Sequence, residues 1–196
     1  MSKKRVLNVG GNDKAIPIPL HYDGWEHVLL DIQPAPGVDL VHDARRLAEL
    51  RAATFDAVYC SHNLEHYYPH EVPLVLAGFH HVLKSDGFVD VRVPDIAAVM
   101  RHAIARDMEL DDVLYESSAG PISVHDVIYG YGREIEASGE DYFAHKRGFT
   151  HKSLLTALQQ AGFPAVWLTD PEPFAVGALA FKRQPTAEQR QKFGLG

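Results

Sequence analysis

A histidine pair with an intervening glutamate is the first feature of this sequence that could carry chemistry. His62, Glu65 and His66 spell H-x-x-E-H within the stretch SHNLEH. Two histidines four residues apart share one face of a helix, where both imidazoles can bind a zinc ion for hydrolysis. Such an enzyme also needs a third protein ligand and a helix long enough to present both histidines. His62 comes just after an apolar run and Pro69 soon interrupts any helix, so we expect no metal ligand here and keep a zinc hydrolase as the less favoured alternative.

A glycine pair and an acid form the second pattern. Gly10 and Gly11 end the apolar run RVLNV, and Asp31 ends another apolar run 21 residues after Gly10. At this spacing a nucleotide-binding βαβ unit places a carboxylate on ribose hydroxyls. The phosphate-binding part of the motif is missing, because Asn12 and Ala15 occupy the positions of its other glycines. The pattern therefore favours a ligand that has ribose and adenine but no phosphate.

Alternating strands and helices are predicted to position these residues. Apolar runs read as buried strands at residues 5–9, 26–32, 38–43, 55–60 and 88–94. Apolar residues at helical spacing follow the third and fourth runs, and Ser85, Asp86 and Gly87 stop the second of these helices. The alternation predicts a parallel sheet with helices on both faces and a ligand site outside the carboxyl ends of the strands.

The second half of the chain is less regular. Residues 95–150 contain one predicted helix, at about 96–108, and are otherwise interpreted as an irregular insertion or lid over the cleft. Thr150 can begin a helix that Gly162 ends. The last two predicted strands are joined by the short link 171–173, so they should pair antiparallel. We expect a single domain over residues 1–184 and a frayed C-terminal tail over residues 185–196.

Six segments in this order resemble a known family. They are VLNVGGN, LLDIQP, LVHDA, FDAVYCSHNLEHY, HHVLKSDGFVDVRVPD and GFTHKSLLTALQQAGF. Together they are similar to class I S-adenosylmethionine-dependent methyltransferases of the small type that carries an SHxLEH motif. The likeness covers about residues 5–94 and 145–182. It implies a Rossmann-like α/β sandwich with a mostly parallel seven-stranded sheet, an antiparallel last strand pair, and S-adenosyl-L-methionine as cofactor.

The resemblance also implies which residues contact the cofactor. The matching positions are Asn8, Val9, Gly10, Gly11, Asp31, Ile32, Asp43, Ala44, Ser61 and His62. By this match the glycine loop cradles the methionine part, Asp31 binds the ribose, and Asp43 accepts from the exocyclic amine of adenine. Asn8 departs from the family, which usually has an acid there. Asn12 replaces a glycine and is the mildest departure, because Asn tolerates a positive φ.

The expected activity is methyl transfer to a small-molecule acceptor. If the acceptor is a hydroxyl, His62 or His145 could take its proton, because an imidazole titrates near neutrality. His125, Tyr129 and Tyr131 lie in the lid region and are further candidates to touch the acceptor. A non-catalytic module that binds S-adenosylmethionine is the other alternative. A nicotinamide oxidoreductase is less favoured because the phosphate loop is missing.

Composition limits the class of protein. The chain has 196 residues, 46% of them hydrophobic, and a net charge of −7, which favours one globular domain and does not indicate a nucleic-acid partner. The single cysteine, Cys60, excludes an internal disulfide. No apolar run has the length of a membrane span or a signal sequence. We expect a soluble, cytoplasmic monomer or homodimer.

Overall fold

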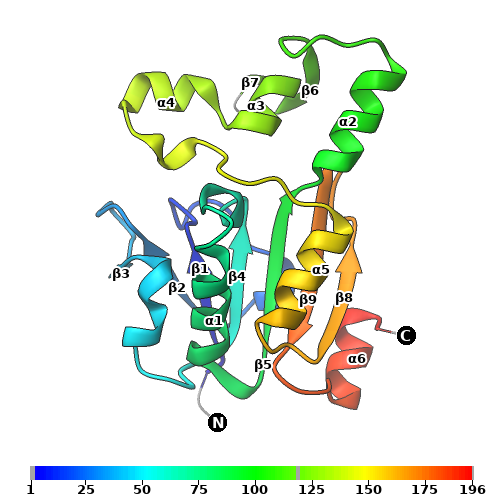
Figure 1. Cartoon of the computed structure of the whole chain (residues 1–196). Helices are drawn as coiled ribbons and strands as arrows, with labels where there is room; N and C mark the ends of the chain where they lie inside the picture. Colours follow the sequence, from blue (N-terminus) through cyan, green and yellow to red (C-terminus); the bar gives the residue numbers. More distant parts are fainter. Residues whose placement is uncertain (1–2, 118–119, 196) are drawn as a thin grey trace.

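Seven strands form the central sheet of this chain, for which the computed structural model describes residues 3–117 and 120–195. In chain order the strands are β1 (Arg5–Val9), β2 (Glu26–Asp31), β3 (Leu40–Val41), β4 (Phe55–Ser61), β5 (Leu83–Pro94), β8 (Ala165–Thr169) and β9 (Ala175–Phe181). They lie side by side in the order β3-β2-β1-β4-β5-β9-β8 (Figure 1). β1 to β5 run parallel, and β9 runs antiparallel to both of its neighbours. The predicted fold class is confirmed.

The register of the parallel strands gathers three predicted site segments at one edge of the sheet. Val9 pairs with Leu30, and Asp31 pairs with Val41, so β1 and β2 end together. The segment 62–66 leaves the same edge at the end of β4. This carboxyl edge is where open α/β sheets bind their ligands.

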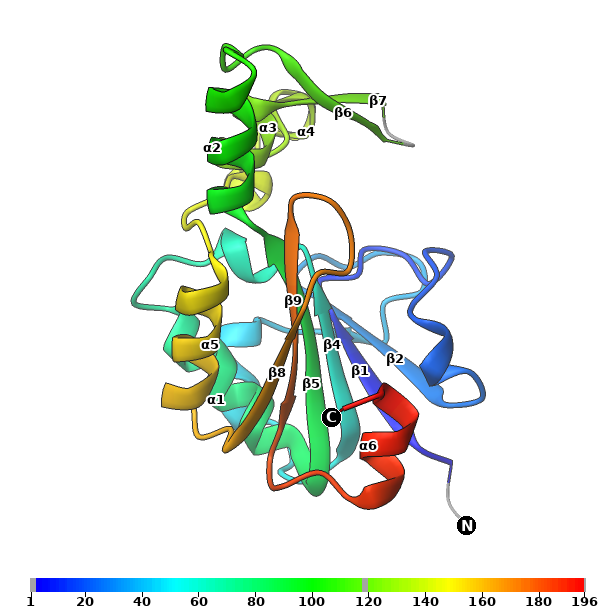
Figure 2. The same ribbon diagram turned by 90° about the vertical axis from the view of Figure 1, so that its right-hand side faces the viewer.

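Helices cover both faces of the sheet, as predicted. α1 (Val72–Val82) and α5 (His151–Gln160) lie on one face, and α6 (Ala187–Phe193) lies on the other (Figure 2). Val75, Leu76 and Phe79 of α1 have no exposed surface, and they belong to the main hydrophobic core. None of the helices that the structure describes is long and apolar enough to span a membrane.

The segments that follow β1, β3 and β4 form short 3₁₀ helices. Between β1 and β2 the chain forms only the 3₁₀ helix η1 (Leu20–Tyr22), and the prolines at 17 and 19 disfavour a regular helix there. The helix predicted after β3 is the 3₁₀ helix η2 (Ala44–Glu49), whose first turn is capped by the side chain of Asp43. η3 (Leu64–His66) is a third 3₁₀ helix, so the histidines of SHNLEH do not share a face of an α-helix.

Residues 95–117 and 120–150 fold into a subdomain, here called the lid, at the carboxyl edge of the sheet (Figure 1). The lid contains α2 (Ile96–Ala105), β6 (Val113–Ser117), β7 (Gly120–Ser123), α3 (Val124–Tyr129), α4 (Gly132–Ser138) and η4 (Asp141–Phe143). β6 and β7 pair antiparallel, and Val99, Leu114, Val124 and Val127 form a small core of their own. The prediction of an irregular insertion is therefore wrong in part. α3 and α4 are too short to show a repeating apolar period.

The C-terminal segment is not frayed, which corrects the prediction for residues 185–196. Thr186 caps α6 through a capping box with Gln189. Phe193 and Leu195 pack against an aromatic cluster on the face of the sheet opposite α1, where the Phe193 and Phe88 ring centroids are 4.9 Å apart. Gly196 lies outside the described residues. The sequence pattern missed this contact because the helix carries few apolar residues.

A buried acid on β5 sits beside this aromatic cluster. Asp90 is 6% exposed, its Oδ2 lies 3.5 Å from His21 Nε2, and its Oδ1 lies 3.8 Å from Arg92 Nε. Neither distance is a hydrogen bond. Burial raises the pKa of Asp90 to about 6, and Arg92 only partly opposes this.

We expect Asp90→Asn to stabilise the protein above pH 6. Folding raises the pKa of Asp90, so the unfolded chain loses the carboxyl proton at a lower pH than the native state does. Between about pH 4 and pH 6 this difference progressively destabilises the native state. The variant should therefore exceed wild type by about 3 kcal/mol in unfolding free energy at pH 7, a difference that vanishes near pH 4. Urea titrations across this range measure it, with exposed Asp86→Asn as control. A variant less stable than wild type at pH 7 would contradict the assignment.

Candidate active site

A narrow cleft of about 100 Å³ opens at the carboxyl ends of β1 and β2. Its lining residues are Val9, Gly10, Leu30, Asp31, Ile32, His42, Asp43, Ala44, Arg45, Asn63, His66, Tyr67, Glu71, Tyr142 and Lys146. Most of them come from strand ends, and Tyr142 and Lys146 come from the lid. The cleft thus lies where the sequence places the cofactor.

The glycine loop after β1 approaches its neighbours too closely for larger residues. Gly10 has a φ of 69°, and a Cβ on it would lie 2.1 Å from the side-chain nitrogen of Asn63. A Cβ on Gly11 would lie 2.2 Å from the amide of Asn8. Asn8 itself is buried, and its amide nitrogen lies 3.2 Å from His27 Nε2. Asn12 adopts a φ of 58°, the left-handed conformation that Asn tolerates.

Asp31 and Asp43, the two acids predicted to contact the cofactor, differ in how many groups of the protein they bind. Among the described residues, the carboxylate of Asp31 accepts one hydrogen bond, from the backbone N–H of Gln33 at 3.1 Å. Asp43 accepts from both the backbone and the guanidinium of Arg45, which also pairs with Glu71. Burial acts to raise the pKa of Asp43, but Arg45 holds it below its usual range. Asp31 is therefore the more available carboxylate.

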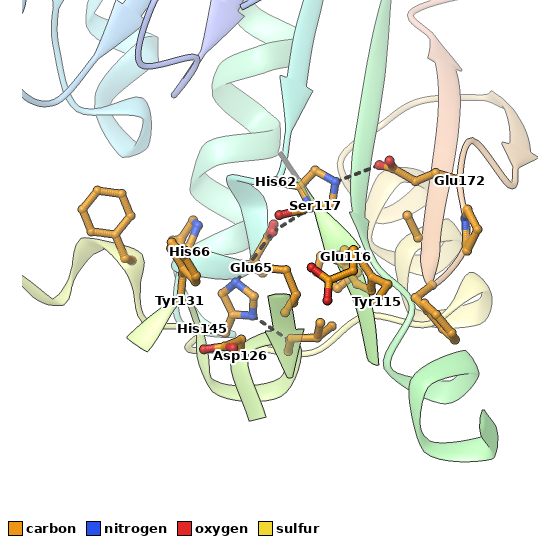
Figure 3. Close-up of a pocket in the computed structure, with 17 residues that line it drawn as sticks. His62, Glu65, His66, Tyr115, Glu116, Ser117, Asp126, Tyr131, His145 and Glu172 are labelled. Atoms are coloured by element: carbon orange, nitrogen blue, oxygen red, sulfur yellow. Dashed lines mark hydrogen bonds and ion pairs between the residues drawn. The ribbon is translucent and has the colours of Figure 1, made fainter. Parts of the chain in front are cut away.

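A second, larger cavity of about 580 Å³ lies between the sheet edge and the lid (Figure 3). It is lined by His62, Glu65, His66, Pro94, Tyr115, Glu116, Ser117, Ile122, Asp126, Val127, Tyr131, Phe143, His145, Glu172, Pro173, Phe174 and Ala175. His66 lines both this cavity and the cofactor cleft. The two spaces therefore meet at the turn after β4.

His62 is held between two carboxylates at the wall of the larger cavity. It adopts a φ of 48°, and its Nε2 lies 3.0 Å from Glu172 Oε1, while its Nδ1 lies 3.6 Å from Glu65 Oε1. Burial opposes the charged form, but Glu172 and Glu65 raise the pKa of His62 to about 10. His62 is thus an imidazolium at neutral pH.

His145 reaches the same wall from the lid. Its Nδ1 donates to the carbonyl of Val127 at 2.9 Å, and its Nε2 lies 4.0 Å from Glu65 Oε1. Burial lowers the pKa of His145, so this imidazole is neutral at pH 7. The backbone carbonyl of Glu65 accepts from the N–H groups of Lys146 and Arg147, which ties this part of the lid to the turn after β4.

Known proteins share the fold of this chain. The family model described as a methyltransferase domain matches residues 22–90. A S-adenosylmethionine-dependent methyltransferase from Archaeoglobus fulgidus superposes with a TM-score of 0.58 at 16% identity, over 92% of this chain and 86% of that chain. The 1,6-didemethyltoxoflavin-N1-methyltransferase of Burkholderia thailandensis, solved with 1,6-didemethyltoxoflavin and S-adenosylhomocysteine, gives 0.53 at 18% identity, over 93% and 72%. No curated protein matches the chain in sequence.

The chain has the fold of S-adenosylmethionine-dependent methyltransferases, and its residues 22–90 match the methyltransferase-domain model. A third similar structure, a methyltransferase from Methanosarcina mazei, gives a TM-score of 0.57 at 14% identity, with 93% of each chain covered. At these identities the similar structures establish the fold of this chain and no more.

The structure brings most of the predicted cofactor residues into one place. Those that line the cleft are Val9, Gly10, Asp31, Ile32, Asp43 and Ala44. Asn8 of β1 and Gly11 of the glycine loop lie against each other and do not line the cleft. Ser61 ends β4 beside the cleft without lining it, and His62 lines the larger cavity instead.

Several residues that line the two cavities were missed by sequence reasoning. Asn63 and Tyr67 lie in the turn that was examined only for its histidines. Glu172 lies in the link between β8 and β9, which was recognised as too short for a crossover and was not placed in space. The shortness of this link could have placed Glu172 near the site. β8 runs parallel to β5, so the link that follows β8 must lie at the carboxyl edge of the sheet.

Proposed function

We propose that this protein transfers the methyl group of S-adenosylmethionine to a small-molecule acceptor bound beneath the lid. The observation that carries the proposal is the meeting of the two cavities at His66. One cavity carries the residues expected for the cofactor, and the other is large enough, at about 580 Å³, for a small ligand. An acceptor there can approach the cofactor cleft from the side of the lid.

The residues of the cleft fit the cofactor. Asp31 offers a carboxylate with one oxygen not engaged by a hydrogen bond among the described residues. The side-chain oxygen of Asn63 is buried and has no hydrogen-bond partner in the part of the chain that the structure describes. A ligand that carries hydroxyl and ammonium donors would satisfy both groups. S-adenosylmethionine has both and supplies a methyl group on a sulfonium.

Opening of the cleft is part of the proposal. At about 100 Å³ the cleft is smaller than typical ligand sites, which measure roughly 300–1,000 Å³. Tyr142 and Lys146 of the lid close it on one side. We expect this part of the lid to move away when the cofactor enters and to exclude water when it returns.

The protein contributes mainly orientation to the transfer. Of the two histidines predicted as possible bases, His62 is already protonated at neutral pH and does not suit that role. His145 is neutral and remains the candidate, because its Nε2 can accept a proton. An acceptor that is already an anion or a free amine needs no base.

Incubation with S-adenosylmethionine labelled in its methyl group tests the activity. We expect label in at least one small hydroxyl, thiol or amine compound, together with S-adenosylhomocysteine. Tight cofactor binding with no transfer to any acceptor would favour the non-catalytic binding module. Absence of cofactor binding would overturn the proposed function.

A further inference from the structure

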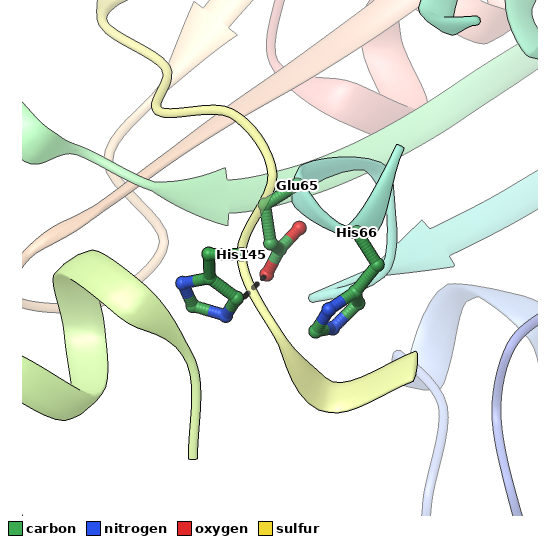
Figure 4. A group of neighbouring side chains, drawn as sticks. All are labelled: Glu65, His66 and His145. Carbon is green, nitrogen blue, oxygen red and sulfur yellow. Dashed lines mark ion pairs between the residues drawn. The ribbon is translucent and has the colours of Figure 1, made fainter. Parts of the chain in front are cut away.

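Three side chains that bear lone pairs converge at the junction of the two cavities. Glu65 and His66 lie in η3, and His145 lies in the lid segment that crosses it (Figure 4). One potential ligand atom from each of the three lies within 4.8 Å of the other two. The side chain of Glu65 is 2% exposed and that of His145 is 12% exposed. The group is therefore enclosed, although it borders the acceptor cavity.

The carboxylate of Glu65 is the unexplained member of this group. Both of its oxygens are buried without a hydrogen-bond partner among the described residues. The nearest imidazole nitrogens, on His62 and His145, lie 3.6 and 4.0 Å from Oε1, beyond hydrogen-bond distance. The charge of His62 offsets part of the charge of Glu65 but brings no hydrogen bond to either oxygen. Native proteins give a buried carboxylate hydrogen bonds or bind it to a metal, so both oxygens of Glu65 can still accept a ligand.

Both histidines are oriented as metal ligands are. His66 Nδ1 lies 3.1 Å from the carbonyl of Ala144, and His145 Nδ1 lies 2.9 Å from the carbonyl of Val127. A carbonyl can only accept, so in each neutral ring Nδ1 carries the proton and Nε2 keeps the lone pair. Imidazoles that bind metals are usually held in this way by a backbone carbonyl or a carboxylate.

We propose that Glu65, His66 and His145 bind one divalent transition-metal ion, for which Zn²⁺ is the probe. Two imidazoles and one carboxylate are a ligand set that catalytic zinc sites use. Zinc bonds of about 2.0–2.2 Å require the three side chains to draw slightly closer by rotation about their own bonds. This set includes two residues of the H-x-x-E-H motif and replaces His62 with His145, so the expectation of no metal ligand is revised. A bound ion takes up the Nε2 lone pair of His145, so His145 can act as the base only in the metal-free protein.

The position of the site indicates what the metal does. Three protein ligands leave at least one coordination position open, and all three residues line the acceptor cavity. An open position on such an ion binds an oxygen donor, so we infer an acceptor that carries a hydroxyl or carboxylate oxygen. This statement about the acceptor rests on the proposed function, whereas the metal site does not.

Equilibrium dialysis of the full-length protein with Zn²⁺ tests the site. We expect one equivalent to bind, and we expect His145→Ala and Glu65→Gln each to weaken binding by at least about a hundredfold. Exposed His70→Ala, close in sequence to the site but outside it, is the matched control and should leave binding unchanged. His62→Ala should also retain the ion, because His62 is paired with Glu172. Circular dichroism confirms that each variant is folded, and Co²⁺ absorption reports the geometry of the site without any activity assay.

Either of two results would overturn the metal site. One is the absence of a stoichiometric Zn²⁺ ion in wild type, and the other is equal binding by wild type, His145→Ala and Glu65→Gln. Loss of binding in His62→Ala as large as in His145→Ala would overturn this ligand set in favour of the sequence motif. S-adenosylmethionine titrated into the same samples separates the two proposals. Cofactor binding without Zn²⁺ binding would leave the methyltransferase standing and remove the metal.

Discussion

Replacing Asp31 with Ala is expected to lower the affinity for S-adenosylmethionine by at least about a hundredfold while leaving the fold intact. A carboxylate that accepts from two ribose hydroxyls makes charge-assisted hydrogen bonds worth about 1.5–3 kcal/mol each, and tenfold in affinity corresponds to about 1.4 kcal/mol. Within the described chain, the carboxylate of Asp31 accepts a single hydrogen bond, from the backbone N–H of Gln33. Its removal should therefore change the free energy of unfolding by about 1 kcal/mol at most.

Calorimetric titration of wild type, Asp31→Ala and Asp31→Asn measures this effect. Asp31→Asn keeps the shape of the side chain and should lose most of the affinity with the charge. Asp23→Ala, in an exposed turn outside both cavities, is the control and should bind like wild type. Unchanged affinity in Asp31→Ala would remove the ribose assignment. If no protein binds the cofactor, Asn8 in place of the usual acid becomes the first position to examine.

The second prediction concerns the glycine that holds His145 in place. Gly130 ends α3 with a φ of 105° and a ψ of 163°, a conformation open almost only to glycine. A Cβ there would lie 2.1 Å from the carbonyl oxygen of Phe143 and 2.8 Å from the Cα of Ala144. Gly130 also forms an isolated β-bridge with Ala144. Because the clashing atoms belong to the backbone, the segment before His145 must shift.

We expect Gly130→Ala to lower the free energy of unfolding by about 2–4 kcal/mol, the sum of backbone strain and overpacking. Displacement of His145 by even 1 Å should also lower methyl transfer by about a hundredfold. Gly139→Ala is the matched control, because Gly139 has a φ of 69° at the end of α4 and nothing within 4 Å of the added methyl. It should cost about 1 kcal/mol and keep activity.

Urea unfolding curves measure the unfolding free energies of Gly130→Ala and Gly139→Ala, and initial rates measure their methyl transfer. Equal stability of Gly130→Ala and Gly139→Ala would show that the lid accommodates the methyl group. The short distance from Gly130 to the backbone of Phe143 and Ala144 would then have no energetic consequence. A stable Gly130→Ala variant with normal rates would contradict the positioning of His145 by this turn.

The fold was predictable because its signals are local. Apolar runs that end in Gly10 and Asp31 mark strands that enter a site, and prolines and glycines mark where helices cannot continue. α6 and the hairpin of β6 and β7 were not predicted, because their stability comes from contacts made by few residues. Phe193, for example, has no apolar repeat around it, and its ring packs on Phe88, which lies far away in the sequence.

The sequence by itself determined the order of the strands along the chain, the place of the cofactor residues at their ends, and the conformational freedom of the glycine loop. These depend on the spacing of apolar residues and on backbone preferences of single residues. Only the tertiary structure decided which side chains meet across the chain. His62 turns to Glu172, 110 residues away, while Glu65 and His66 meet His145, because the register of β4 and the path of the lid set those distances. No spacing within SHNLEH contains that information.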